Sequence, residues 1–415
     1  MSQSLLIRGA RQLITLRGPA RVRRGKALGE LAIIPDGAVL IQDDCIEEVG
    51  SGRRVMNLNS ARRAEETDVS GCIVMPGFVD SHTHLLLGAA GSAGGQAEEP
   101  GSEHALRWKR RLGGVSVKRL AYEARKRVHL CARHGTTTLE AKTGCAADVS
   151  GELKSLRALA ALDGRPLDIV STVLGGDSAP WERLHSPERY ADWLAWDLLP
   201  QVRAKRLARF VDLDDDAGAL HGEAARRVLA AALALGFGIR LHAGGQDQGV
   251  APLAVEFQAA SVDHLQCVAD DDARLLAASN VVATLTPARS FYLSGAPFTA
   301  ARKLIDAGAA VALASGYHPD HCPTLSMLEV IALACRMYGM TPAEAIAAAT
   351  INAAASLQLA HRIGSLEAGK QADLVVLEVP DFRDLPCAFG MNVVRMVLKR
   401  GRIVYRCGEI SDYGS

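Results

Sequence analysis

Residues 73–84 of the chain read IVMPGFVDSHTH. The apolar residues of this stretch belong to a run over 72–80 that has the length and composition of a buried strand. Residues two apart on a strand point to the same side, so His82 and His84 would project together where the strand ends. Two imidazoles on one side can chelate a divalent ion. The stretch therefore predicts a buried strand that carries a metal-binding pair.

The middle of the chain repeats this kind of apolar run. Seven more runs of strand length follow, at 136–141, 168–174, 209–213, 238–243, 261–265, 280–285 and 310–314. Most are separated by Ala-, Leu- and Arg-rich stretches with helical spacing, such as 153–162 and 223–235. Eight strands that alternate with helices predict an α/β fold, a (β/α)8 TIM barrel, whose site lies at the carboxyl ends of the strands.

Both ends of the chain differ from this middle. Short apolar strands separated by turns occupy the first 75 residues, and similar strands return near the C-terminus. We therefore expect a composite β-sandwich domain, 1–75 and 365–415, beside a barrel domain, 76–364. A Gly-, Ala- and Ser-rich insertion at 88–101 follows the first barrel strand, and it is either a surface loop or a lid over the barrel mouth.

The charge balance and the cysteines limit the classes of protein. The 415 residues include 47 Lys and Arg and 46 Asp and Glu, a formal net charge of +1, whereas nucleic-acid binding needs a basic surplus. The nine cysteines form no C-x-x-C pair, which is typical of reduced thiols in the cytoplasm. The longest apolar stretch, 228–239, is too short to cross a bilayer, and the N-terminus lacks the apolar core of a signal peptide. We expect a cytoplasmic protein that binds neither nucleic acid nor membrane.

Two more histidines fall at predicted strand ends. His242 follows the apolar residues 238–241, and His264 follows 261–263. A histidine at one strand end is commonly a core or surface residue, but four on the same rim are difficult to explain in that way. Neutral imidazole suits zinc or iron. We predict one divalent metal ion at this rim, with zinc preferred to iron.

Several motifs together resemble one family. They are PGFVDSHTH (76–84), HGTTTLEAKTG (134–144), LHA (241–243), VDHL (262–265), MTPAEA (340–345) and GSLEAGKQADLV (364–375). Spread over nearly the whole chain, they are similar to the amidohydrolase superfamily and, within it, to the imidazolonepropionases, which hydrolyse a cyclic amide. The resemblance implies that His82, His84 and His242 hold the metal and that His264 assists beside it. It also implies that the metal activates water, that the substrate is a small molecule and that the protein is a homodimer.

Other positions depart from the pattern of that family. Gly316 stands where the family has a metal-binding Asp after strand eight, and Gly245 stands where it has a Glu after the strand-five histidine. Asp177 replaces a His after strand three, and Cys145 replaces a Tyr after strand two. The Arg that holds the substrate carboxylate is absent from 85–91. A glycine neither binds a metal nor moves a proton, and general base catalysis typically contributes about 10²–10⁴-fold.

Three explanations of these departures are open. In the first, the site is rebuilt for another hydrolysis, with Asp177, or His318 and Asp320, in place of the missing carboxylate; otherwise Asp177 caps a helix and the loop charges are solvated. In the second, three histidines keep a metal for a lyase, isomerase or binding role, in which Cys145 is either a thiol nucleophile or an inert buried thiol. In the third, the protein is an inactive relative. Cys145, His318 and Asp320 are the residues we expect against the substrate.

Glu140 and Lys142 match the E-x-K of the family at the end of strand two. Because they are two apart, both reach the barrel mouth as catalytic groups or both form an ion pair inside the barrel. The sequence as a whole predicts a metal-dependent amidohydrolase that acts on a cyclic amide or related C–N bond other than that of imidazolonepropionate. The alternative is a non-hydrolytic or inactive relative that binds a small molecule.

Overall fold

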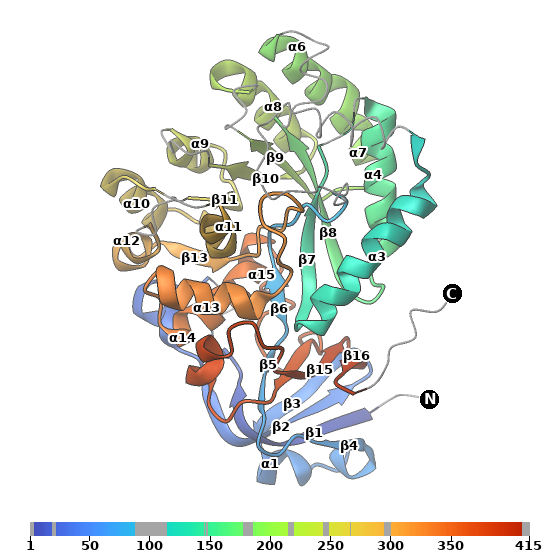
Figure 1. Ribbon diagram of the computed structural model, residues 1–415, viewed down its shortest axis with the longest axis vertical. Coiled ribbons are helices and arrows are strands. Elements are labelled where there is room, and N and C mark those ends of the chain that lie inside the picture. The colour runs from blue at the N-terminus through green and yellow to red at the C-terminus, as the bar shows by residue number, and fades with distance from the viewer. Residues whose placement is uncertain are drawn as a thin grey trace.

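The structure of the chain, a computed structural model, describes residues 4–18, 22–87, 114–144, 146, 148–176, 186–214, 220–243, 249–265, 267–293 and 300–408. This part of the chain contains two eight-stranded sheets, one in a barrel and one below it (Figure 1). The predicted lid at 88–101 lies outside the described residues, and so do Cys145, Asp177 and Gly245.

The middle of the chain forms the parallel barrel. Its strands are β6 (Phe78–Asp80), β7 (Thr136–Lys142), β8 (Asp168–Gly175), β9 (Phe210–Asp214), β10 (Gly238–His242), β11 (Ser261–Asp263), β12 (Val282–Leu285) and β13 (Ala310–Leu313). Each strand pairs in parallel with the next one along the chain. Each of the eight predicted apolar runs overlaps one of these strands, so the (β/α)8 prediction is confirmed.

Helices cover the outside of the barrel (Figure 1). They are α3 (Val117–Arg133), α4 (Val149–Leu162), α6 (Pro187–Asp192), η3 (Trp193–Leu198), α7 (Leu199–Ala204), α8 (Gly222–Ala234), α9 (Val250–Glu256), α10 (Asp270–Ala277), α11 (Pro287–Tyr292), α12 (Ala300–Ala307), α13 (Met327–Met337), α14 (Pro342–Ala347), η4 (Ala348–Asn352) and α15 (Ala353–Ser356). Some begin at a capping side chain: Ser116 accepts a hydrogen bond from the N–H of Arg119, and Asp148 from that of Gly151. None of the helices in the described ranges is long and apolar enough to cross a bilayer.

The barrel closes beside the H-x-H motif. The backbone N–H of Gly316 donates to the carbonyl of His82 (3.1 Å), and that of His84 donates to the carbonyl of Tyr317 (2.8 Å). These two bonds join the segment after β6, the first barrel strand, to the segment after β13, the last one. The backbone of the H-x-H motif is therefore fixed by the closure of the barrel itself.

Both ends of the chain build the second sheet. Its strands are β1 (Ser4–Ile14), β2 (Ile33–Gln42), β3 (Cys45–Ser51), β4 (Glu65–Asp68), β5 (Ile73–Pro76), β14 (Leu374–Leu377), β15 (Val394–Lys399) and β16 (Arg402–Arg406), and its short helices are η1 (Gly25–Gly29), α1 (Gly52–Met56), η2 (Ala61–Arg63) and η5 (Phe382–Cys387). The order is β16-β15-β14-β5-β1-β2-β3, with β4 beside β1. β14 pairs antiparallel with β5, so the two termini share one sheet, as predicted. The exact domain boundaries stay predictions.

The predicted strand at 72–80 is two strands. It divides at Gly77, with β5 in the terminal sheet and β6 in the barrel. A Cβ atom at Gly77 would lie 2.2 Å from Cγ2 of Thr137 on β7, so only glycine lets the chain pass here from one sheet to the other. The single-strand prediction was wrong because an unbroken apolar run carries no signal for a change of sheet.

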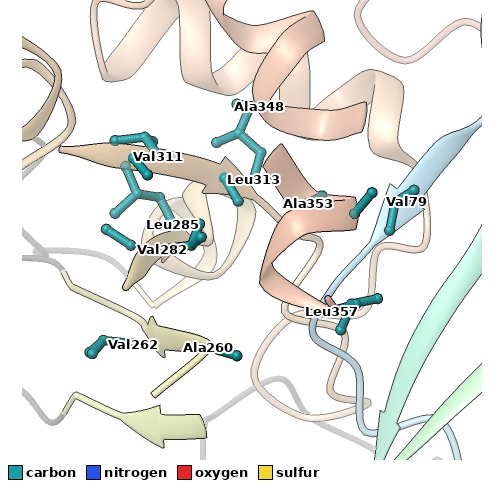
Figure 2. Close-up of a cluster of buried hydrophobic side chains, with 14 of the residues drawn as sticks. Val79, Ala260, Val262, Val282, Leu285, Val311, Leu313, Ala348, Ala353 and Leu357 are labelled. Atoms are coloured by element: carbon teal, nitrogen blue, oxygen red, sulfur yellow. The ribbon is translucent and has the colours of Figure 1, made fainter. Parts of the chain in front are cut away.

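The outward side chains of the barrel strands form the main core. In Figure 2, Leu313 of β13 lies near Ala348, and Val79 of β6 lies near Ala353. Such small residues let a helix approach the barrel closely, which suits a chain in which only 5% of residues are aromatic. Because side chains alternate along a strand, the opposite positions point into the barrel, and there they carry polar groups.

Candidate metal centre

Three buried histidines converge at the carboxyl ends of the barrel strands. His82 follows β6, His242 ends β10 and His264 follows β11. One ring nitrogen from each lies within 4.8 Å of the other two, and Nε2 of His82 is 3.1 Å from Nε2 of His264. All three side chains are buried. We call these three residues the histidine triad.

His264 reaches the triad through an unusual backbone conformation. On a regular strand, Asp263 and His264 would point to opposite faces. The φ angle of His264 is +66°, in the left-handed region that non-glycine residues rarely adopt. This turn lets both side chains reach the interior of the barrel. Backbone strain of this kind is commonly found at functional sites.

Each ring of the histidine triad has a side-chain oxygen within 3.0 Å of its Nδ1. The distances are 2.7 Å from His82 to Oδ2 of Asp263, 3.0 Å from His242 to Oδ2 of Asp212, and 2.7 Å from His264 to Oγ1 of Thr286. Partners at Nδ1 leave Nε2 of each ring for another ligand. Two of the three supports are carboxylates, as in the carboxylate–histidine–metal arrangement of many metal sites.

The triad fits a single divalent ion. Two acceptor nitrogens 3.1 Å apart repel each other unless a proton or a cation lies between them. Nitrogen ligands of a tetrahedral zinc ion, with Zn–N distances of about 2.0–2.1 Å, lie about 3.3 Å apart. Burial lowers the pKa of both His82 and His264 well below the ordinary value, with Lys142 adding to the effect at His82 and His82 adding to it at His264. Both rings are therefore neutral, which is the form that binds metals.

His242 has a different charge balance. Burial works against its protonation, but the neighbouring Asp212 carboxylate outweighs burial and raises the pKa of His242 above the ordinary value. A metal ion bound at this ring would displace the proton, so metal affinity should depend on pH through His242.

His84 lies beside the triad. Its ring centroid is 5.4 Å from that of His82, 6.3 Å from that of His242 and 5.3 Å from that of His318. The ring of His318 is in turn 4.3 Å from that of His321. The imidazoles thus form a row from the barrel interior to the rim. The metal ligands expected from the family resemblance share two members with the triad, and they differ in taking His84 in place of His264.

The loop that was predicted to replace the missing carboxylate is a tight hairpin. His318 and Cys322 exchange backbone hydrogen bonds of 3.0 and 2.9 Å. The backbone N–H of Asp320 donates to Nδ1 of His318 (3.2 Å). The structure therefore places His318 next to His84, at the edge of the site, with Asp320 two residues further along the hairpin.

Gly316, the position at which the family has its metal-binding Asp, is tightly packed. Its φ angle is +65°, and a Cβ atom there would lie 3.0 Å from both Cβ and Cγ2 of Thr286. Thr286 is the residue that supports His264. The preceding residue, Ser315, is held by Asp80, which accepts from its N–H (2.9 Å) and its Oγ–H (2.6 Å). The loss of the carboxylate is therefore accommodated in the packing of three neighbouring strand ends.

A buried ionic cluster lies next to the histidine triad inside the barrel. Its members are Glu140, Lys142, Asp212, Arg240 and Asp263, and all five side chains have 0% exposure. The structure thus places Glu140 and Lys142 in ion pairs in the barrel interior, the second of the two arrangements considered for them. Their predicted catalytic roles stay predictions, as do those of Asp177 and Cys145.

Sequence reasoning missed three members of this cluster. Asp212, Arg240 and Asp263 are charged residues inside apolar strand runs. Arg240 is two residues before His242. Asp212, on the neighbouring strand β9, is the register partner of Arg240. A charged residue two positions from a site histidine faces the same side of a strand, and this is the signal that would have identified Arg240.

Comparison with known proteins identifies the family of the chain. The model of the amidohydrolase family matches residues 189–404. The imidazolonepropionase of Symbiobacterium thermophilum is 40% identical, with 98% of each chain covered, and that of Geobacillus kaustophilus is 37% identical, with 98% of this chain and 99% of the relative covered.

Two solved structures share the fold at low sequence identity. A zinc-bound adenosine deaminase from Xanthomonas campestris has a TM-score of 0.72 at 19% identity and covers 99% of this chain and 95% of its own. A zinc complex of a mutant atrazine chlorohydrolase from Arthrobacter aurescens has a TM-score of 0.74 at 16% identity, with 97% and 95% covered. From the family match and the full-length relatives together, the chain belongs to the amidohydrolase family and is similar to the imidazolonepropionases.

Proposed function

We propose that the chain is a metal-dependent hydrolase that opens a cyclic amide or a related C–N bond. The observation that carries this proposal is the buried histidine triad, with a partner at each Nδ1 and two Nε2 atoms 3.1 Å apart. A bound divalent ion, for which we propose zinc, would supply activation of a water molecule and polarisation of the amide carbonyl. The names of the relatives support a cyclic amide as the substrate class.

We further propose that the substrate is a small molecule other than imidazolonepropionate. Gly316 and Gly245 stand at positions where the family has acids, and residues 85–91 lack the Arg that holds the substrate carboxylate. A site that loses these groups loses both a proton acceptor and a charged contact to the substrate. A cytoplasmic homodimer remains our expectation for the state of the protein.

Asp214 is our candidate for the acceptor of the proton of the attacking water. It is the last residue of β9 and the register partner of His242 on β10. It lies two residues after Asp212, whose side chain is inside the barrel, so it faces the same side at the rim. Asp320 and Asp177 are the alternatives predicted from the sequence. Asn variants at these three positions should separate them, because only the true acceptor should lower kcat by about 10²-fold or more.

The proposed function is tested by metal analysis followed by substrate comparison. The purified protein, reloaded with Zn²⁺, should contain about one ion per chain. It should hydrolyse at least one member of a panel of five- and six-membered cyclic amides faster than imidazolonepropionate, with the Geobacillus kaustophilus relative assayed in parallel. Absence of stoichiometric metal after reloading would rule out the metal-dependent mechanism. Bound metal without hydrolysis across the panel would favour the non-hydrolytic alternative, and efficient turnover of imidazolonepropionate would refute the change of substrate.

The third histidine ligand is tested by two matched variants. If the triad binds the metal, His264→Ala should lose stoichiometric metal and His84→Ala should retain it. The ligand set expected from the family resemblance gives the opposite result. Because both substitutions remove the same side chain, the pair controls for the general effect of losing an imidazole near the metal.

A further inference from the structure

One side chain in the barrel interior contacts the supports of two histidines. Lys142 Nζ lies 2.8 Å from Oε1 of Glu140, 2.5 Å from Oδ2 of Asp212 and 3.4 Å from Oδ2 of Asp263. It ends β7, and its backbone N–H donates to the carbonyl of Thr83, between the two histidines of the H-x-H motif (2.9 Å). The ammonium group is therefore fixed both by its strand and by three carboxylates.

The contacts of Lys142 involve the same oxygen atoms that hold the imidazoles. Oδ2 of Asp212 is the atom 3.0 Å from Nδ1 of His242, and Oδ2 of Asp263 is the atom 2.7 Å from Nδ1 of His82. A carboxylate oxygen can accept hydrogen bonds from two donors, and their directions together determine where it lies. Moving the ammonium group would thus move both oxygens and, through them, both rings.

Arg240, the other cation of the cluster, does not hold both of these carboxylates. Arg240 donates to Asp263 (2.8 Å) and to the carbonyls of Ser81 and Ser356, and its ion-pair partners among the described residues are Asp263 and Glu140. Among the described residues, Lys142 is the cation that contacts both carboxylates supporting the triad. It also balances part of their charge in a region of low dielectric, where unpaired carboxylates are costly.

We propose that Lys142 is a positioning residue of the metal centre, which sets the orientation of His82 and His242 through Asp263 and Asp212. This inference rests on the proposed metal-dependent function. It gives the E-x-K motif of this chain a role that is neither contact with the substrate nor stability alone. Because outer-sphere partners of metal-bound histidines typically affect metal affinity by about 10–100-fold, we expect an effect of that size from one residue that acts on two of them.

The test uses the full-length protein with Co²⁺ as a spectroscopic probe. Lys142→Met should weaken Co²⁺ binding at least about tenfold and shift the visible absorption bands, which report ligand geometry. Lys399→Met is the matched control, since Lys399 is also buried between two carboxylates, Asp373 at 2.7 Å and Asp168 at 2.9 Å, but contacts no histidine. It should lose stability while its Co²⁺ affinity and spectrum stay those of the unmodified protein.

A second variant keeps the test decisive if Lys142→Met does not fold. Lys142→Arg keeps the charge, but a planar guanidinium cannot place one nitrogen among all three carboxylates. It should therefore fold and still show a shifted Co²⁺ spectrum and weaker binding, whereas a residue that only balances charge would be replaced without either change. An unchanged spectrum and affinity in Lys142→Arg, or in folded Lys142→Met, overturns the inference. Failure of the unmodified protein to bind Co²⁺ would instead contradict the proposed function.

Discussion

Two buried lysines lie near opposite ends of barrel strand β7. Lys142 is its last residue, and Lys399, the last residue of β15, lies 3.4 Å from Oγ1 of Thr138 near its beginning. Each ammonium group contacts more than one carboxylate, and each lysine side chain is almost fully buried. The two clusters thus have the same ionic chemistry within one strand length of each other.

The two clusters differ in the other partners of their carboxylates. Asp212 and Asp263 each contact both Lys142 and an imidazole, that of His242 and that of His82 respectively. Asp373 and Asp168 each contact both Lys399 and Arg400. The backbone N–H of Arg400 donates to Asp373 (2.9 Å), and its guanidinium donates to Asp168 (2.8 Å). Since Asp168 begins β8 and Asp373 precedes β14, the second cluster joins the barrel to the terminal sheet. Two buried ion pairs of the same chemistry thus differ in what their carboxylates hold, imidazoles in one and the join between two sheets in the other.

The largest effect should come from the imidazoles at the Lys142 end. We expect His82→Ala and His242→Ala each to weaken Zn²⁺ binding by more than about 100-fold, that is, by more than the loss of an outer-sphere partner. Equilibrium competition with a chromogenic chelator would measure this. An affinity within tenfold of the unmodified protein in both variants would remove the two residues from the metal site. His361→Ala, outside the row of imidazoles, is the control and should bind normally.

The carboxylates of the two clusters should give the next largest contrast. Asp212→Asn keeps the shape of the side chain but weakens the interaction with Nδ1 of His242, so we expect metal affinity to fall by about 10–100-fold. Asp168→Asn makes the same change in the Lys399 cluster and should leave affinity within about twofold. Isothermal titration with Zn²⁺ would measure both. Equal losses of affinity in the two variants would mean that metal affinity depends on global stability rather than on the support of His242.

A smaller effect should follow from restoring the missing acid. We expect Gly316→Asp to lower metal affinity by a few-fold rather than raise it, because its Cβ atom would press on Thr286, which supports His264. Gly308→Asp is the control, since Gly308 also has a positive φ (+87°) but no atom near its Cβ position. It should show the backbone strain without the loss of affinity. A tighter metal site in Gly316→Asp would show that the position can still serve as a ligand position.

The sequence was sufficient for the barrel and for the rim of histidines. The eight apolar runs are local signals, and the chain needs no long-range information to reveal them. His82, His242 and His264 were identified because each lies at or just after the end of such a run. The change of sheet at Gly77 was not, because it depends on the distance to Thr137 in another strand.

The supports of the triad could not be read from the sequence in the same way. Asp212 and Asp263 meet Lys142 only when β9 and β11 are placed around the barrel, and a pairing across it leaves no pattern along the chain. His264 reaches the triad through one backbone angle, its positive φ, for which the residue type gives no indication.

Lys399→Met should have the smallest effect on metal affinity and a clear effect on the free energy of unfolding. Breaking a buried ion pair typically costs about 3–5 kcal/mol, and we expect the lower end because the Asp168 side chain keeps 17% exposure. Burial works to raise the pKa of Asp168, but Lys399, Gln371 and Arg400 together hold it below the ordinary value. A depressed carboxyl pKa stabilises the fold above the pKa of the unfolded chain, about 4, and that stabilisation disappears as the pH falls through the folded value.

The pH dependence therefore separates this ion pair from a general packing defect. In urea unfolding, the difference in stability between the unmodified protein and Lys399→Met should be full at pH 7 and shrink below about pH 4, where protonated Asp168 no longer attracts Lys399. A difference that stays constant from pH 7 to pH 3 would assign the loss to the packing of the lysine stem. At pH 7 the variant should bind Zn²⁺ as the unmodified protein does, because neither Asp373 nor Asp168 holds an imidazole. Lys399→Met should therefore lose stability and keep its metal affinity, whereas Lys142→Met, at the other end of β7, should lose metal affinity.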